Sequence, residues 1–232
     1  MTGTVAIGYL HGIEVTSSFA NSLAHLLIYE AFLTDDSPVR AMFPEFSGVN
    51  VSSARNELVR KFLTECDADW LLMIDSDMQF DRDALRRLMA NADLERAPIV
   101  GALCFGADDT KLFPTLYSFE QDGDGKVHTV RYKTYPQQSM FQVGATGAAF
   151  VLVHRGVLQA VQERAFNSVY PWFQETELNG HRCGEDITFF LRAGICGYPV
   201  WVDTGVEVGH QKAWVLTAEK YREQLAREGT TL

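Results

Sequence analysis

Residues 66–78 read CDADWLLMIDSDM, and this stretch predicts how the chain folds. The apolar run from Trp70 to Ile74 stops at two carboxylates, Asp75 and Asp77, which are separated by one small residue. A short apolar run of this kind is typical of a buried strand in a parallel sheet, and α/β proteins bind ligands at the carboxyl ends of such strands. We therefore expect both carboxylates at the ligand-binding edge of an α/β sheet.

Two carboxylates in this position suit a divalent cation. Residues two apart on a straight strand point to the same face of the sheet. Asp75 and Asp77 also lie where the strand ends and the chain turns, so both carboxylates can reach one ion and a diphosphate bound to it. Asp-Ser-Asp alone also occurs in ordinary turns. The setting favours the metal site, because residues 81–89 predict a helix directly after the pair.

The rest of the chain alternates between strand and helix patterns. Strands are predicted near residues 5–10, 38–43, 70–75 and 97–104, with helices near 16–31, 52–63 and 81–89 between them. Ser52 and Ser53 are the expected cap of the second helix. Such alternation predicts an α/β fold with a doubly wound, Rossmann-like, mostly parallel sheet and a small β-hairpin insertion near residues 113–133.

The length, composition and charge of the chain limit the classes of protein to which it can belong. A chain of 232 residues, 47% of them hydrophobic, suffices for one core, so we expect a single domain over residues 1–232 with a C-terminal helix at 216–232. No apolar run approaches a membrane span, no basic leader opens the chain, and the four cysteines form no CxxC pair. We expect a soluble, cytoplasmic protein with no membrane partner. A net charge of −10 argues against strong nucleic-acid binding.

A second group of polar residues lies late in the chain. Gly184, Glu185 and Asp186 open a predicted helix, and His210 follows a predicted strand. The helix dipole alone favours acids in a first turn, and a lone histidine is more often structural than a ligand. Because these residues follow an Asp-x-Asp strand end in the chain, the alternative is that they share one functional site with Asp75 and Asp77.

In this order the motifs resemble the GT-A class of glycosyltransferases, in particular family-two-like enzymes of the bacterial and phage type. The resemblance covers Val5 to about Trp214. Its elements are the first strand-loop-helix unit, Ala54-Arg55-Asn56, Asp75-Ser76-Asp77, the loop from Gly144 to Gly147, Gly184-Glu185-Asp186 and His210.

The resemblance implies roles for the residues of the donor site. Asp77 would bind the metal directly with His210, while Asp75 would contact the donor or the ion's coordination shell. An imidazole beside carboxylate oxygen favours Mn²⁺, although Mg²⁺ could serve. Arg55 would help to bind the nucleotide. His11 and Glu14, in the turn after the first strand, would lie beside the base.

The implied activity is a metal-dependent glycosyltransferase, hexosyl or pentosyl, that moves a sugar from a nucleoside diphosphate sugar to a hydroxyl with inversion. Asp186 would be the general base, and Glu185 would orient the acceptor or the base. Residues 1–104 would bind the nucleotide sugar, and residues 105–215 the acceptor. The acceptor stays open: a glycan, a protein, a small molecule or a modified nucleobase each offers a hydroxyl.

Other functions and roles fit the same residues. A sugar-nucleotide pyrophosphorylase would need a basic phosphate loop, which residues 8–12 lack. A retaining transferase or a non-catalytic nucleotide-sugar-binding module could keep the same donor site. Pro171-Trp172-Phe173 could be a sugar-stacking platform or part of the core. Lys212 and Trp214 could belong to a loop over the donor.

Overall fold

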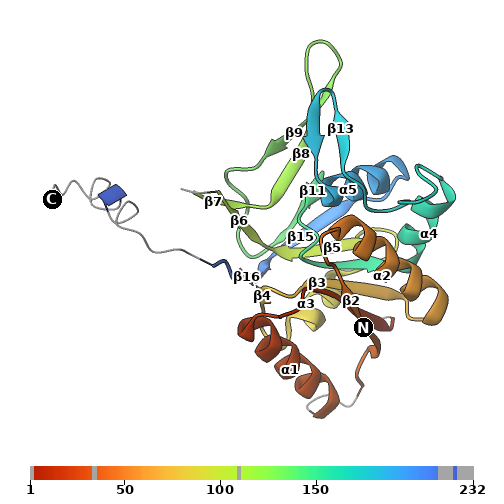
Figure 1. The fold of residues 1–232 in the computed structure, drawn as a ribbon, viewed down its shortest axis with the longest axis vertical. Helices are drawn as coiled ribbons and strands as arrows, with labels where there is room; N and C mark the ends of the chain where they lie inside the picture. The colour runs from red at the N-terminus through yellow and green to blue at the C-terminus, as the bar shows by residue number, and fades with distance from the viewer. Residues whose placement is uncertain (1–2, 33–35, 109–110, 214–221, 224–232) are drawn as a thin grey trace.

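The computed structural model describes residues 3–32, 36–108, 111–213 and 222–223. A seven-stranded mixed sheet forms the centre of the molecule (Figure 1). In spatial order its strands are β10 (Met140–Val143), β15 (Val200–Glu207), β5 (Ile99–Leu103), β12 (Phe150–His154), β3 (Trp70–Asp75), β1 (Val5–His11) and β2 (Val39–Phe46). Five of them share one direction, while β12 and β10 run opposite to their neighbours. The predicted α/β class with a mostly parallel sheet is confirmed.

Helices cover both faces of this sheet. On one face lie α1 (Ser17–Phe32) and α3 (Ala84–Asn91), and on the other lie α2 (Val51–Glu65), α4 (Arg155–Glu163) and α5 (Glu185–Ile195). Strand β3 is apolar on both sides because it serves both layers: Leu71 and Met73 join the α2 side, and Trp70, Leu72 and Ile74 the α1 side.

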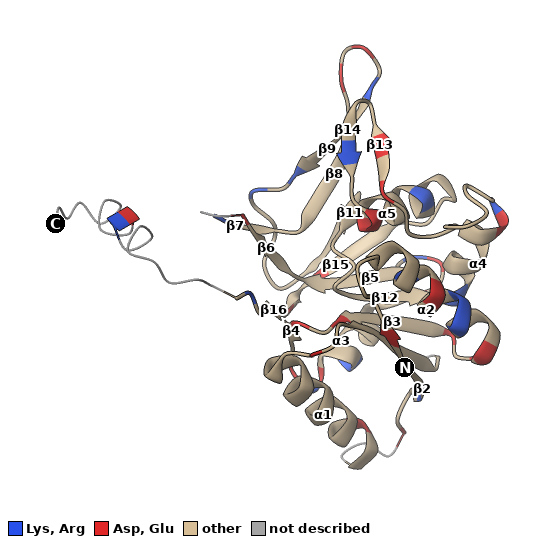
Figure 2. Cartoon of the chain, viewed as in Figure 1, with Lys and Arg blue, Asp and Glu red and all other residues tan. Residues whose placement is uncertain are grey.

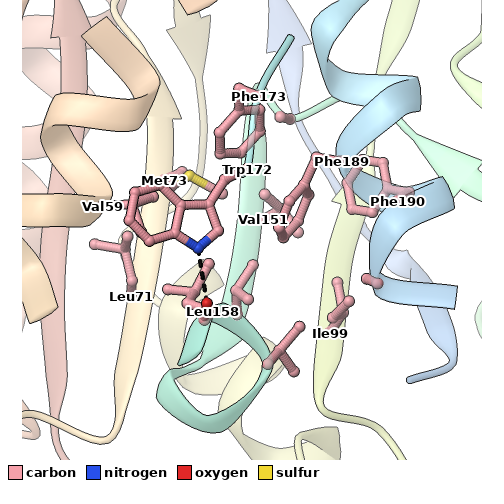
Figure 3. Close-up of a cluster of buried hydrophobic side chains, with 14 of the residues drawn as sticks. Val59, Leu71, Met73, Ile99, Val151, Leu158, Trp172, Phe173, Phe189 and Phe190 are labelled. Carbon is pink, nitrogen blue, oxygen red and sulfur yellow. Dashed lines mark hydrogen bonds between the residues drawn. The ribbon is translucent and has the colours of Figure 1, made fainter. Parts of the chain in front are cut away.

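The core on the α2 side is aromatic. Trp172 and Phe173 are 1% and 0% exposed, and Phe173 stacks on Phe189 of α5 with ring centroids 4.6 Å apart. The indole Nε1 of Trp172 donates a 2.7 Å hydrogen bond to the Leu158 carbonyl (Figure 3). These rings are core residues, so a sugar-stacking platform at Trp172 and Phe173 is wrong.

Short strands extend from the carboxyl edge of the sheet. The hairpin of β8 (Leu116–Gln121) and β9 (Val127–Arg131) is the predicted insertion, and β11 (Ala145–Thr146) pairs with its first strand. Three smaller pairs lie at the same end (Figure 1): β6 (Phe105–Ala107) with β7 (Leu112–Pro114), β13 (Thr176–Leu178) with β14 (His181–Cys183), and β4 (Met78–Gln79) with β16 (Gly209–His210).

Three expectations differ from the structure or lie outside it. Ala31 is exposed, although the pattern of α1 predicts it to face inward. The side-chain cap of α2 is Asn50, whose Oδ1 accepts from the Ser53 amide at 2.9 Å, in place of Ser52 or Ser53. Trp214 and most of the predicted helix at 216–232 lie outside the described residues. Among the described helices, none has the length and apolar character that crossing a bilayer requires.

Candidate active site

Asp75 ends β3 and meets a buried arginine. By strand alternation Asp75 continues the face of Leu71 and Met73, and α2 covers that face. Its two carboxylate oxygens therefore accept hydrogen bonds from Nη2 of Arg55 at 2.9 and 3.1 Å. Burial raises the pKa of Asp75, and the Arg55 guanidinium opposes that rise. The structure places Asp75 against Arg55.

Arg55 joins three segments at the site. Its side chain is 5% exposed, Nη1 donates to the Ala148 carbonyl at 2.9 Å, and Nε lies 3.5 Å from Oε1 of Glu185. Burial lowers the pKa of this guanidinium, but the acids at 75, 185 and 186 outweigh burial and leave the pKa above its ordinary value. Nε has no hydrogen-bond partner in the described part of the chain. Arg55 thus carries a fixed positive charge with one unused donor.

The neighbour of Arg55, Asn56, holds the start of α2 in place. It is 1% exposed, and its Nδ2 donates to the carbonyls of Ser52 and Phe173, both at 2.6 Å. Its Oδ1 accepts from the amides of Trp172 and Phe173 at 3.2 and 3.4 Å. The Ala-Arg-Asn sequence therefore supplies one residue for the site and one that ties α2 to the segment before α5.

Asp77 lies beside His210 because of the short ladder between β4 and β16. His210 pairs with Met78, and the amide of Gln211 donates to the Asp77 carbonyl at 2.8 Å. This places Nε2 of His210 3.0 Å from Oδ2 of Asp77. Partial burial raises the pKa of Asp77, but the hydrogen bonds from His210 and Lys212 outweigh it and leave that pKa below its usual value.

The imidazole is oriented by a backbone carbonyl. Nδ1 of His210 lies 3.0 Å from the Phe105 oxygen, and because a carbonyl only accepts, Nδ1 carries a proton. In a neutral ring the lone pair of Nε2 then faces the Asp77 carboxylate. The hydrogen bond with Asp77 accordingly raises the pKa of His210. The same lone pair is free to bind a cation once the proton leaves.

Asp77 and His210 fit a bound divalent metal. A ligating histidine commonly donates its other N–H to a carbonyl, as His210 does to Phe105. In the described part of the chain no group of three or more His, Cys, Asp or Glu could hold an ion. Two protein ligands still suffice where substrate phosphates and water complete the shell. Oxygen and imidazole ligands suit Mn²⁺.

Glu185 and Asp186 form the first turn of α5, next to β11 (Figure 2). Burial, with a smaller contribution from the Glu185 charge, raises the pKa of Asp186 to about 6. Its Oδ1 accepts from the Ile187 amide at 2.7 Å. A Cβ atom on Gly184 would stand 2.9 Å from that oxygen, so glycine at the N-cap leaves room for the carboxylate.

His11 and Glu14 lie at the carboxyl end of β1. Nδ1 of His11 contacts the Gly12 oxygen at 2.8 Å, and its ring lies 5.9 Å from that of Phe46 at the end of β2. Glu14 is exposed. Beside Glu185 a pocket of about 620 Å³ opens between the start of α2 and the segment from Tyr170 to Glu175.

The structure thus brings Arg55, Asp75 and Glu185 into contact, and Asp77 into contact with His210. Sequence reasoning included Asn56 in a motif but gave it no role. It missed the carbonyls of Ala148 and Phe105, since a backbone carbonyl carries no sequence signal. The loop from Gly144 to Gly147, another element of the resemblance, packs closely on its neighbours at Gly144. A Cβ there would stand 2.9 Å from the Phe119 amide, so Gly144 permits backbone packing against β8.

Comparisons with known proteins identify the fold. No protein-family model matches the sequence, and a search of curated proteins finds no match. Among solved structures the chain is similar to A197 from STIV (TM-score 0.56, 14% identity, 90% of this chain and 86% of that chain). It is also similar to GalNAc-T7 solved with UDP, GalNAc and Mn²⁺ (TM-score 0.56, 12% identity, 90% of this chain), and spans 44% of that protein. The chain has a GT-A-like α/β fold.

Proposed function

We propose that this protein is a metal-dependent glycosyltransferase that moves a sugar from a nucleoside diphosphate sugar to an acceptor hydroxyl with inversion. The observation that carries the proposal is the Asp77–His210 pair at the carboxyl edge of the sheet, with the imidazole oriented by Phe105. The similarity to GalNAc-T7, solved with UDP, GalNAc and Mn²⁺, supports the same donor class.

In the donor half, residues 1–104, the protein binds and orients the nucleotide sugar. Asp77, with His210 from the other half, would hold Mn²⁺ or Mg²⁺, which would neutralise the diphosphate as it leaves. Arg55 keeps Asp75 and Glu185 in place, and its positive charge would help to bind the nucleotide. His11 and Glu14 border the space for the base at the end of β1.

In the acceptor half, residues 105–215, Asp186 acts as the general base. With a pKa of about 6 it is ionised at neutral pH yet basic enough to accept a proton from a hydroxyl as that oxygen attacks the anomeric carbon. Attack from the face opposite the diphosphate inverts the sugar. Glu185 lies beside Arg55 and borders the 620 Å³ pocket, where an acceptor could be oriented.

Release of nucleoside diphosphate from a panel of sugar nucleotides tests this function. We expect Mn²⁺-dependent release with one donor, abolished by EDTA and by Asp186→Asn, and a product of inverted anomeric configuration by NMR. Retained configuration would contradict the role of Asp186. Exchange of pyrophosphate into the donor would indicate a pyrophosphorylase, and metal-dependent binding without turnover a non-catalytic module.

A further inference from the structure

Two side-chain nitrogens, from Lys212 and His210, meet at one carboxylate oxygen of the proposed metal site. Nζ of Lys212 lies 3.1 Å from Oδ2 of Asp77, and Nε2 of His210 lies 3.0 Å from the same atom. The Lys212 side chain is 50% exposed, and its ammonium group contacts Asp77. The lysine therefore occupies a cation position at the oxygen that a metal would use.

The backbone before Lys212 is held at both sides of the site. The Gln211 amide donates to the Asp77 carbonyl at 2.8 Å, and the Gln211 side-chain oxygen accepts from Oγ of Ser18 at 2.6 Å. The ladder between β4 and β16 holds Gly209 and His210. The ammonium group can thus change partners by rotation of the long lysine side chain, without moving this segment.

A divalent ion bound by Asp77 and His210 would repel the ammonium group from Asp77, because like charges this close repel strongly in a partly buried site. A diphosphate bound to the same ion would bring new negative charge next to the displaced ammonium group. Lysine suits this exchange, since its ammonium is a compact charge with three rotatable donors.

We propose that Lys212 occupies the cation position on Asp77 in the ligand-free protein and moves to the donor diphosphate when the metal binds, which makes metal and nucleotide binding depend on each other. This inference rests on the proposed function. The metal alone must displace Lys212 and binds weakly. With a nucleoside diphosphate present, Lys212 gains a new partner, so each ligand strengthens the other by the same factor.

Binding of Mn²⁺, followed by the EPR signal of the free ion, tests the exchange without any turnover. In the wild type we expect UDP, GDP, CDP or TDP to tighten Mn²⁺ binding about tenfold or more, within the usual range of coupling between sites. In Lys212→Met we expect Mn²⁺ alone to bind several-fold tighter, and the enhancement by the nucleotide to shrink several-fold. Lys212→Arg should keep most of the enhancement, and Lys126→Met, an exposed lysine at the β8–β9 turn, should match the wild type.

Equal Mn²⁺ affinity and equal enhancement in Lys212→Met and wild type would overturn the inference and leave the proposed function standing. A wild type that binds no nucleoside diphosphate with Mn²⁺ would overturn the proposed function. The affinity for Mn²⁺ alone, compared between wild type and Lys212→Met, would then still decide whether Lys212 competes with the metal.

Discussion

Asp186 keeps its carboxylate in a setting that disfavours charge. Its pKa of about 6 in the folded protein lies above the ordinary value of 3.8, so between about pH 4 and pH 6 the folded state holds a proton that the unfolded state has already lost. Stability is therefore lost as the pH rises from about 4 through 6, and the loss persists at neutral pH. A catalytic role would explain why an acid stays at a position where its charge is costly.

Replacement of Asp186 by Asn should separate stability from activity. We expect Asp186→Asn to raise the free energy of unfolding by about 1 to 3 kcal/mol above pH 6, because the uncharged amide can still accept from the Ile187 amide. Transfer should fall about 10²- to 10⁴-fold. Urea unfolding at pH 4 and pH 8 tests the first expectation, and the gain should vanish at pH 4.

The pH dependence of the wild-type rate provides the companion measurement. Since Asp186 must be ionised to accept a proton, kcat/KM should rise through about pH 6 and level off above it. A wild-type profile that is flat from pH 5 to 8, or an Asp186→Asn enzyme with normal activity, would exclude this residue as the base.

Gly184 offers a milder change at the same place. In Gly184→Ala the new Cβ would stand 2.9 Å from Oδ1 of Asp186, and the carboxylate can yield because it ends a short, rotatable side chain. The backbone of Gly184 has φ of −62°, which alanine adopts readily. We expect the melting temperature to change by no more than a few degrees and kcat to fall about tenfold or more. Unchanged kcat would show that the carboxylate position is not critical.

At the scale of single residues, the sequence predicted which side chains belong to the candidate site, but not which side chains each of them contacts. Asp75 and Asp77 were predicted as a metal-binding pair, yet Asp75 contacts Arg55 and Asp77 contacts His210 and Lys212. Strand alternation directs Asp75 toward α2, and after the turn Asp77 contacts the segment of His210 and Lys212. The role of Asp75 toward a metal remains a prediction.

At the scale of elements, Asn56 links α2 to the segment before α5. Asn56→Ala would leave the buried amides and carbonyls of this junction without partners, so we expect unfolding free energy to fall by about 2 to 3 kcal/mol. Asn21→Ala on the exposed face of α1 is the matched control and should change it by no more than about 0.5 kcal/mol. Equal effects of the two substitutions in chemical denaturation would contradict this role.

Element type and approximate position were predictable because apolar periodicity reports burial. Strand direction was not: β12 is as apolar as β3 and β5, yet it runs antiparallel between them. Its direction depends on how the chain returns to the sheet, which no local pattern encodes. The pairing of β4 with β16 escaped prediction for a similar reason, since two-residue strands have no periodicity.

At the scale of the whole molecule, Arg55 connects the two proposed halves. It contacts Asp75 in the first, and Ala148 and Glu185 in the second. We expect Arg55→Met to lower the free energy of unfolding by about 3 to 5 kcal/mol, because it leaves buried acids without their counter-charge. Arg60→Met removes an exposed ion pair with Glu57 and should cost about 1 kcal/mol or less. Similar losses in the two variants would contradict this role of Arg55.

The overall layering was predictable, and the assembly of the site followed from it in part. A parallel α/β sheet brings strand ends to one edge. The resemblance to the GT-A class, and not the sheet pattern alone, implied that residues as distant as 77 and 210 share a site, and the two side chains are in contact. The sequence could not predict Lys212 on Asp77, because that contact depends on how the last described segment crosses the site.

The most direct test of the account is a thermal-shift panel of UDP-, GDP-, CMP- and TDP-linked sugars, with and without Mn²⁺. It compares the wild type, Asp77→Asn and the exposed control Asp81→Asn. We predict that one donor stabilises the wild type and Asp81→Asn only when Mn²⁺ is present, and that Asp77→Asn loses this effect, since a ligand stabilises the state that binds it. The account would be contradicted if no sugar nucleotide stabilised the wild type in the presence of Mn²⁺, or if the donor stabilised Asp77→Asn as much as the wild type.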